Sequence, residues 1–328
     1  MALDPTVDNG FSARNAWFLT HLCRVAYLDE EDVRKRCEEL GFIPSTFQWI
    51  EKSPDAKPGM DHDTQSFVVS HGDYILVTFR GSLGDADWVT NNDLFAMETQ
   101  HGRVHRGQYE AVETVWGKMV PAIKELQAEN PDIPIFVCGH SLGAALATIA
   151  TSRLVLDEGI TVRAVYPVGG PRVFHEDYAS RFDAVFKNRH FRLVNNNDIV
   201  PRFPFDMEAV SLSLFSFRHA GIEIYINRSG NIGTRGLWDS IAGRFQALLG
   251  GEISDGTADH YPINYEEAMR SAATKESKNM VSRTVGTLMD AVMEVAPSAK
   301  YVDKTGPSFA VTEELKKQMA EAGAVNTI

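Results

Sequence analysis

Hydrophobic and polar residues are patterned so that helices and short strands alternate along most of the chain. Helical spacing of apolar residues gives way to short apolar runs bounded by Gly, Asp and Pro. In chain order we predict helices at 12–27 and 30–40, strands at 66–70 and 74–79, a helix at 109–127, and strands at 135–137, 162–168, 191–194 and 222–226. Pro121 should kink or interrupt the long helix. This alternation predicts an α/β fold with a mostly parallel sheet covered by helices on both faces.

The clearest chemical signal is the pentapeptide Gly139-His140-Ser141-Leu142-Gly143, which lies between a predicted strand and a run of small helix-forming residues. A G-x-S-x-G turn between a strand and a helix is typical of a nucleophile elbow, which exposes the serine hydroxyl. The glycines avoid collisions between strand and helix, and the N–H of Leu142 at the helix start is suited to stabilising an oxyanion. We therefore predict Ser141 as a nucleophile; the alternative is a glycine-rich turn that merely opens a buried helix.

A serine nucleophile needs an acid and a histidine, which follow in that order in elbow enzymes. Asp198 follows the strand 191–194 directly and therefore ranks above Asp206, Asp255 and Asp259. Its side chain could equally cap a turn in an Asn/Asp-rich loop.

Two histidines compete for the role of base. His260 lies on a late loop, which suits a side chain that must reach the elbow, whereas His219 at a strand entrance suits a packed structural histidine. The pattern favours His260 and leaves His219 open. We expect the side chain of His140 to point away from that of Ser141.

Short segments that match a known family occur in family order. They are Val77–Ser82, Asp87-Trp88, Val104–Gly107, the elbow, Gly169–Val173, Asn197–Pro201, His219–Gly221 and Asp259-His260. The chain thus resembles the class 3 lipases, which have the α/β-hydrolase fold and include secreted fungal triacylglycerol lipases. The resemblance implies a Ser141–Asp198–His260 triad, an oxyanion hole made by the N–H groups of Ser82 and Leu142, and no cofactor. From its residues alone, Ser82 could also be a turn residue that ends a strand.

The resemblance also implies a lid at 83–95, with Leu83, Trp88, Val89 and Phe95 as candidate substrate contacts. Three aspartates and two asparagines interrupt this segment, so it lacks the wide apolar stripe of a helix that enters an oil surface. We therefore expect a short gate and at most transient contact with a lipid–water interface.

We predict a large catalytic domain at 1–272 and a helical extension at 273–328 that packs on it. The chain has 328 residues, is 44% hydrophobic, and has three cysteines without disulfide spacing. An apolar stripe in the extension predicts core packing, with a homodimer interface or a cover over the acyl pocket as alternatives. The stripe consists of Val281, Val285, Leu288, Val292 and Val295.

The formal net charge of −12 argues against nucleic-acid binding, and neutral esters suit such a surface better. We predict no metal site, because Asp61-His62-Asp63 and the pair His101 and His105 have no matched third ligand. No signal peptide is visible, which fits a cytoplasmic protein, a mature secreted form or signal-independent export.

The sequence therefore predicts an ester hydrolase, with a lipase acting on acylglycerols as the leading interpretation. An esterase of short-chain or aromatic acyl esters, resembling feruloyl esterases, is the alternative within enzymes. A catalytically silent lipid- or partner-binding module is the alternative outside them.

Overall fold

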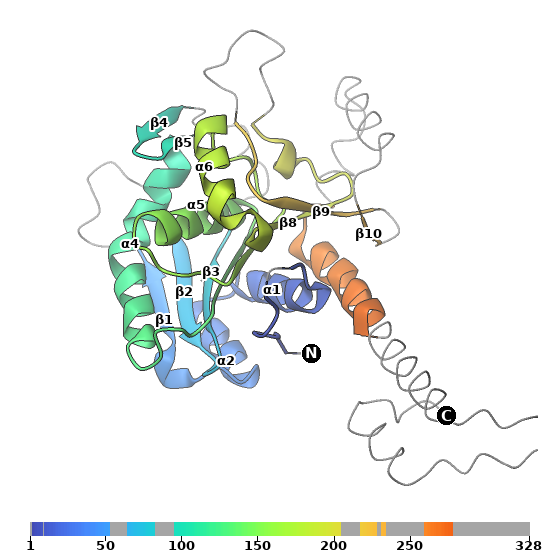
Figure 1. The fold of residues 1–328 in the computed structure, drawn as a ribbon. Coiled ribbons are helices and arrows are strands. Elements are labelled where there is room, and N and C mark those ends of the chain that lie inside the picture. The colour runs from blue at the N-terminus through green and yellow to red at the C-terminus, as the bar shows by residue number, and fades with distance from the viewer. Residues whose placement is uncertain are drawn as a thin grey trace, which may run out of the picture. The chain divides into compact units, whose positions relative to one another are not determined.

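A central eight-stranded sheet organises the protein. The computed structural model describes residues 2–8, 10–52, 64–82, 95–204, 217–227, 231–233 and 259–277. In spatial order the strands are β1 (Gln48–Glu51), β2 (Gln65–Ser70), β3 (Ile75–Phe79), β6 (Ile135–His140), β7 (Ala164–Val168), β8 (Phe191–Asn195), β9 (Ile222–Ile226) and β10 (Ile232–Gly233). Strands β3 to β9 pair in parallel, whereas β1, β2 and β3 pair antiparallel, as do β9 and β10 (Figure 1). The predicted mostly parallel sheet is confirmed.

Six helices of the described residues surround the sheet. They are α1 (Ala13–Val25), α2 (Glu30–Glu39), α4 (Arg106–Gln127), α5 (Leu142–Leu156), α6 (Glu176–Phe186) and a helix at 262–277, with the 3-10 turns η1 (Pro44–Thr46), η2 (Lys187–Arg189) and η3 (Val200–Arg202). Three of the helices, α4, α5 and α6, lie between parallel strands in the sequence. Side-chain caps fix where the first two begin: Ser12 accepts a hydrogen bond from the N–H of Asn15, and Asp29 from that of Asp32. Such caps satisfy N–H groups that have no partner within the helix.

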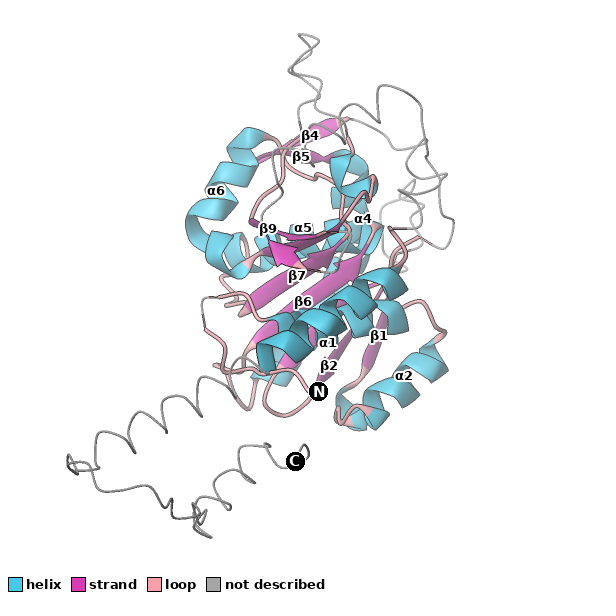
Figure 2. Ribbon diagram, turned by 90° about the vertical axis from the view of Figure 1, so that its right-hand side faces the viewer, coloured by secondary structure: helices cyan, strands magenta, loops and turns pink. Residues whose placement is uncertain are grey.

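Both faces of the sheet are buried (Figure 2). Side chains alternate along a strand, so Ile135 and Val137 of β6 join the apolar core that contains residues of α4, α5 and α6. Phe136 and Cys138 join the core on the other face, which contains residues of α1 and α2 and residues Tyr265 and Met269. The helices therefore enclose the strands and leave the strand ends for chemistry.

The predicted helix at 109–127 differs from the structure in two respects. Helix α4 begins earlier, at Arg106, because His105 caps it by accepting from the N–H of Gln108. It also continues through Pro121 without interruption. Proline removes one helical hydrogen bond. Burial of the apolar face, which includes Val115, Met119 and Ile123, outweighs that loss.

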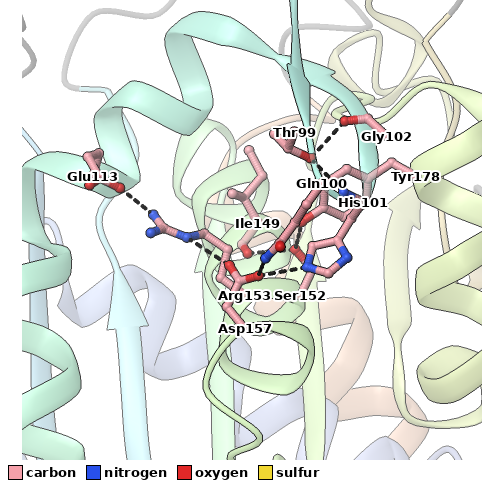
Figure 3. Close-up of polar contacts among 10 residues, drawn as sticks. All are labelled: Thr99, Gln100, His101, Gly102, Glu113, Ile149, Ser152, Arg153, Asp157 and Tyr178. Atoms are coloured by element: carbon pink, nitrogen blue, oxygen red, sulfur yellow. Dashed lines mark hydrogen bonds and ion pairs between the residues drawn. The ribbon is translucent and has the colours of Figure 1, made fainter.

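A small hairpin, β4 (Ala96–Thr99) and β5 (Gly102–His105), is anchored to the body by polar contacts (Figure 3). In its turn, His101 Nε2 lies 2.7 Å from Asp157 Oδ1, and Gln100 Nε2 donates to the same oxygen at 2.9 Å. Asp157 follows α5 directly, so the hairpin is tied to the end of the helix that begins at the elbow.

Arg153 on α5 supports this anchor (Figure 3). Its Nη1 donates to Glu113 Oε2 at 2.7 Å, and its Nε lies 3.5 Å from Asp157 Oδ2. The guanidinium carbon lies 3.9 Å from the ring centre of Trp116. A buried arginine is thus held between two carboxylates and an aromatic face.

The chain divides into two units, Met1–Ala272 and Ala273–Ile328. The first contains the sheet and all labelled helices. Most of the second, including the predicted apolar stripe, lies outside the described residues. Its packing on the catalytic domain and the homodimer remain predictions.

Candidate active site

Ser141 occupies a sharp turn between β6 and α5. Its backbone has φ 59° and ψ −125°, a conformation that non-glycine residues rarely adopt. Its N–H donates to the carbonyl of Val168 on the next strand at 2.9 Å. This strained strand–turn–helix geometry is that of a nucleophile elbow.

The two flanking glycines are required by close packing. A Cβ on Gly139 would collide with the main chain of Gly143. A Cβ on Gly143 would collide with the carbonyl of Phe79, at the end of β3. The elbow can therefore approach β3 only without side chains at these positions.

Ser141, His260 and Asp198 lie in one hydrogen-bonded line. His260 Nε2 is 2.8 Å from Ser141 Oγ, and His260 Nδ1 is 2.9 Å from Asp198 Oδ2. An ionised carboxylate only accepts, so Nδ1 carries the hydrogen and Nε2 accepts from the serine hydroxyl. Asp198 is fully buried, whereas the side chain of His260 is 15% exposed. This arrangement can remove a proton from the serine as its oxygen attacks.

Tyr265, which the sequence analysis did not single out, contacts the carboxylate. Its hydroxyl donates to Asp198 Oδ2 at 2.5 Å and accepts from the N–H of Asn195 at 3.0 Å. Burial and the neighbouring Asp198 hold the pKa of Tyr265 well above its ordinary value, so the hydroxyl stays a donor. The N–H of Val200 donates to the other carboxylate oxygen at 2.9 Å. The orientation of Asp198 is thus fixed from several sides.

Asp259, a rival for the acid, instead joins the loop of His260 to the loop of Asp198. Its Oδ2 accepts from Asn196 Nδ2 at 2.9 Å and from the N–H of Asn197 at 3.1 Å. Its carbonyl accepts from Asn195 Nδ2 at 3.0 Å. The other rivals, Asp206 and Asp255, lie outside the described residues.

The competing histidines have other partners. His219 Nε2 lies 2.7 Å from the carbonyl of Pro201, which makes it a support for the turn after Asp198. We expect the side chain of His140 to point away from that of Ser141. In the structure its ring is hydrogen-bonded to Tyr27 and to the main chain of His260, and its centre lies 4.7 Å from that of the His260 ring. Only His260, of these three, is hydrogen-bonded to Ser141 among the described residues.

Leu142 belongs to the elbow, and Ser82 lies in a segment beside it. Leu142 is the first residue of α5, where N–H groups have no partner within the helix. Ser82 follows β3 and is half-buried, and a Cβ on the preceding Gly81 would lie 2.6 Å from the carbonyl of His140. The segment of Ser82 therefore passes directly beside the elbow. Its role in an oxyanion hole remains a prediction.

Most of the predicted lid, including Leu83, Trp88 and Val89, lies outside the described residues. Phe95 is 59% exposed, with the guanidinium carbon of Arg106 5.1 Å from its ring centre. The described residues contain no group of three potential metal ligands. Nor is any described helix long and apolar enough to span a bilayer.

Comparison with known proteins agrees with this geometry. Residues 76–208 match the family model for lipase (class 3). The secreted mono- and diacylglycerol lipase 1 of Fusarium solani is 32% identical over 157 residues, which cover 47% of this chain and 44% of that protein. The secreted mono- and diacylglycerol lipase A of Penicillium cyclopium is 29% identical, covering 52% of this chain and 54% of that protein. The chain thus spans about half the length of the curated relatives it matches.

Solved structures support the fold. Lipase II from Rhizopus niveus superposes with a TM-score of 0.54 at 23% identity, covering 76% of this chain and 90% of that one. A lipase from Rhizopus microsporus var. chinensis gives a TM-score of 0.51 at 24% identity, covering 70% and 81%. The elbow, the sheet and the family match agree with one another, and residues 76–208 of this chain are similar to the class 3 lipase family.

Proposed function

We propose that the protein is a serine hydrolase that cleaves acylglycerol esters through an acyl-enzyme intermediate. The observation that carries this proposal is the continuous hydrogen-bonded line from Ser141 Oγ through the ring of His260 to buried Asp198. Such a line on a strained elbow serves to activate a hydroxyl that is otherwise a weak nucleophile.

In the proposed reaction, Ser141 Oγ attacks the ester carbonyl carbon while His260 Nε2 takes the hydroxyl proton. Asp198 stabilises the resulting imidazolium, and the N–H groups of Ser82 and Leu142 donate to the oxyanion. The ester C–O bond then breaks, and His260 gives the proton to the departing alcohol. Water attacks the acyl-enzyme with His260 again as base, which releases the fatty acid and restores Ser141. No step uses a cofactor.

Two observations support a lipid ester as substrate. Two of the relatives are named as secreted mono- and diacylglycerol lipases, and another as a triacylglycerol lipase. Beside His260, Tyr261 and Ile263 expose 46% and 43% of their surfaces, which gives an acyl chain apolar contacts near the ester.

An esterase of short-chain or aromatic acyl esters is the second candidate. It is favoured by the polar sequence of residues 83–95, with aspartates at 85, 87 and 93. A gate of that composition would admit soluble esters without a lipid surface. Both candidates use the same triad, so only the substrate series below separates them.

The test is hydrolysis of a chain-length series of esters, from acetyl esters to mono-, di- and trioleoylglycerol, measured on both sides of each solubility limit. Ser141→Ala should abolish turnover and labelling by a fluorophosphonate, whereas Ser152→Ala, a change at a buried serine in the helix that follows Ser141, should retain both. A preference for long acylglycerols supports the lipase. Saturation by soluble short-chain esters would instead establish the esterase. Turnover equal to that of Ser141→Ala throughout would refute the hydrolase and favour a silent binding module.

A further inference from the structure

His140, the residue before Ser141, has its ring between Tyr27 and His260. Its Nδ1 lies 2.8 Å from Tyr27 Oη, and its Nε2 lies 2.7 Å from the main-chain oxygen of His260. The rings of His140 and His260 have centres 4.7 Å apart and planes inclined by 33°. His140 is 2% exposed, so these contacts are shielded from water.

The partners of His140 determine where its proton lies. A main-chain carbonyl can only accept, so Nε2 must carry the hydrogen and donate to His260. Nδ1 is then the acceptor of the neutral ring, and the hydroxyl of Tyr27 donates to it. Burial, followed by the neighbouring His260 ring, holds the pKa of His140 well below the ordinary imidazole range, consistent with a neutral ring.

Tyr27 joins a third part of the chain to this contact. It follows α1, and a Cβ on Gly81 would collide with its hydroxyl. The segment before Ser82 therefore packs against the same side chain that selects the tautomer of His140. Four positions far apart in sequence, Tyr27, Gly81, His140 and His260, therefore meet around His140, the residue before the serine.

The contacts to His260 have separate roles. Ser141 and Asp198 hold the two nitrogens of its imidazole, but neither holds the main chain that carries the ring. His140 contacts that main chain directly. A misplacement of about 1 Å in a reacting group can reduce a rate about a hundredfold, so support of the backbone matters.

We propose that His140 is a positioning residue: by donating Nε2–H to the carbonyl of His260 it fixes the main chain from which the imidazole reaches Ser141, and Tyr27 selects the tautomer that can donate. No proton of His140 is transferred in the reaction. The consequence for ester hydrolysis rests on the proposed function, whereas the support of the loop does not.

The kinetic test compares His140→Leu, His140→Gln and Tyr27→Phe with His190→Gln, a buried histidine outside the site. We expect His140→Leu to lower kcat about 10- to 100-fold with KM changed less than about threefold, because a transition-state geometry is lost. His140→Gln retains an N–H donor and should recover most of that loss. His190→Gln should leave kcat within about twofold.

A double substitution tests the tautomer. Tyr27→Phe should lower kcat about threefold to tenfold when His140 is present, because the ring is no longer fixed in its donating form. In the His140→Gln background it should have no further effect, since an amide donor needs no selection. An equal loss in both backgrounds would overturn the role assigned to Tyr27.

Hydrogen exchange gives a readout that does not depend on hydrolysis. His140→Leu should raise exchange in residues 259–265 relative to the wild type, while His190→Gln should not. Unchanged exchange there, or a wild-type kcat in His140→Leu, would overturn the proposal. If His140→Leu fails to fold, the same comparison is made between Tyr27→Phe and the wild type, where Tyr27→Phe should raise exchange in residues 259–265 and unchanged exchange would overturn the proposal. If the wild type hydrolyses no ester, the proposed function fails, and the exchange result still decides whether His140 holds the loop.

Discussion

His190 should make the protein less stable in acid, by an amount that can be worked out from its surroundings. Its ring is fully buried, with its centre 5.7 Å from that of Phe182. Neither ring nitrogen has a hydrogen-bond partner among the described residues. Burial, with a smaller contribution from Arg192, lowers its pKa to about 3.

The direction of the effect follows from proton binding. An unfolded histidine has a pKa of about 6.5, so below that pH the unfolded chain binds a proton that the folded protein excludes. Above about pH 7 His190 therefore does not lower the free energy of unfolding. As the pH drops from 6.5 toward 3, its effect lowers that free energy progressively. At about 1.4 kcal/mol per pH unit for one proton, the loss between pH 6.5 and 4.5 is about 2 to 3 kcal/mol.

The assay is urea unfolding followed by tryptophan fluorescence at pH 7.5, 6.5, 5.5 and 4.5, for the wild type and His190→Gln. Glutamine cannot be protonated in this pH range. Between pH 7.5 and 4.5 the free energy of unfolding of His190→Gln should therefore fall by about 2 to 3 kcal/mol less than that of the wild type, whatever its value at pH 7.5. Phe182→Leu is the matched control, because it loosens the same packing without removing a titratable group. Its free energy of unfolding, plotted against pH, should run parallel to that of the wild type. A His190→Gln curve that also runs parallel would refute the reasoning.

Three further predictions concern packing and polar contacts. Tyr265→Phe should lower kcat about tenfold and the free energy of unfolding by about 1.5–3 kcal/mol, because Asp198 loses a hydrogen bond to its charge; steady-state kinetics and urea unfolding measure these. Gly143→Ala should lower the free energy of unfolding by about 1–3 kcal/mol or prevent folding, because the added Cβ collides with the main chain of Phe79. Thermal unfolding measures this loss. Arg153→Met should lower the free energy of unfolding, measured in urea, by about 2 kcal/mol, since Glu113 and Asp157 lose the cation they contact. It should also raise hydrogen exchange in the β4–β5 turn.

Each of these predictions has a result that would contradict it. Wild-type kinetics in Tyr265→Phe would mean that its hydroxyl does not orient Asp198. An unchanged melting temperature in Gly143→Ala would mean that β3 can move away from the elbow. Arg153→Met with unchanged exchange at residues 99–102 would mean that the hairpin does not depend on this ion pair.

The elbow could be predicted from sequence because its determinants are local. A strand, two glycines and a helix lie within a short stretch around Ser141, and each leaves its own pattern. The central strands β2, β3, β6, β7, β8 and β9 and the limits of α1 and α2 are predicted for the same reason, whereas β1, β4, β5, β10 and α6 are not predicted. Pro121 is a further exception, since burial of one helix face is a tertiary effect that a local rule does not include.

The residues alone favour Asp198 and His260 as acid and base but do not exclude their rivals. Asp198 and His260 are 62 positions apart, so their meeting depends on how two loops fold toward one sheet edge. The resemblance implies the same two residues, and the geometry brings them together, while their catalytic roles remain predictions. Tyr265 left no signal beyond an aromatic residue after His260. The contact of His140 with a carbonyl of the loop could not be read from any motif.

The edges of the sheet have a consequence for solubility. An edge strand presents unpaired N–H and C=O groups that another chain can extend. Among the residues that the structure describes, the outermost strands are short: β1 spans Gln48–Glu51 and β10 spans Ile232–Gly233. At the end of β1, Lys118 Nζ donates to the carbonyls of Glu51 and Lys52 at 3.3 and 3.4 Å, which occupies acceptors that a foreign strand would need. Loss of this lysine should leave the fold intact but make strand-to-strand aggregation easier during concentration or storage.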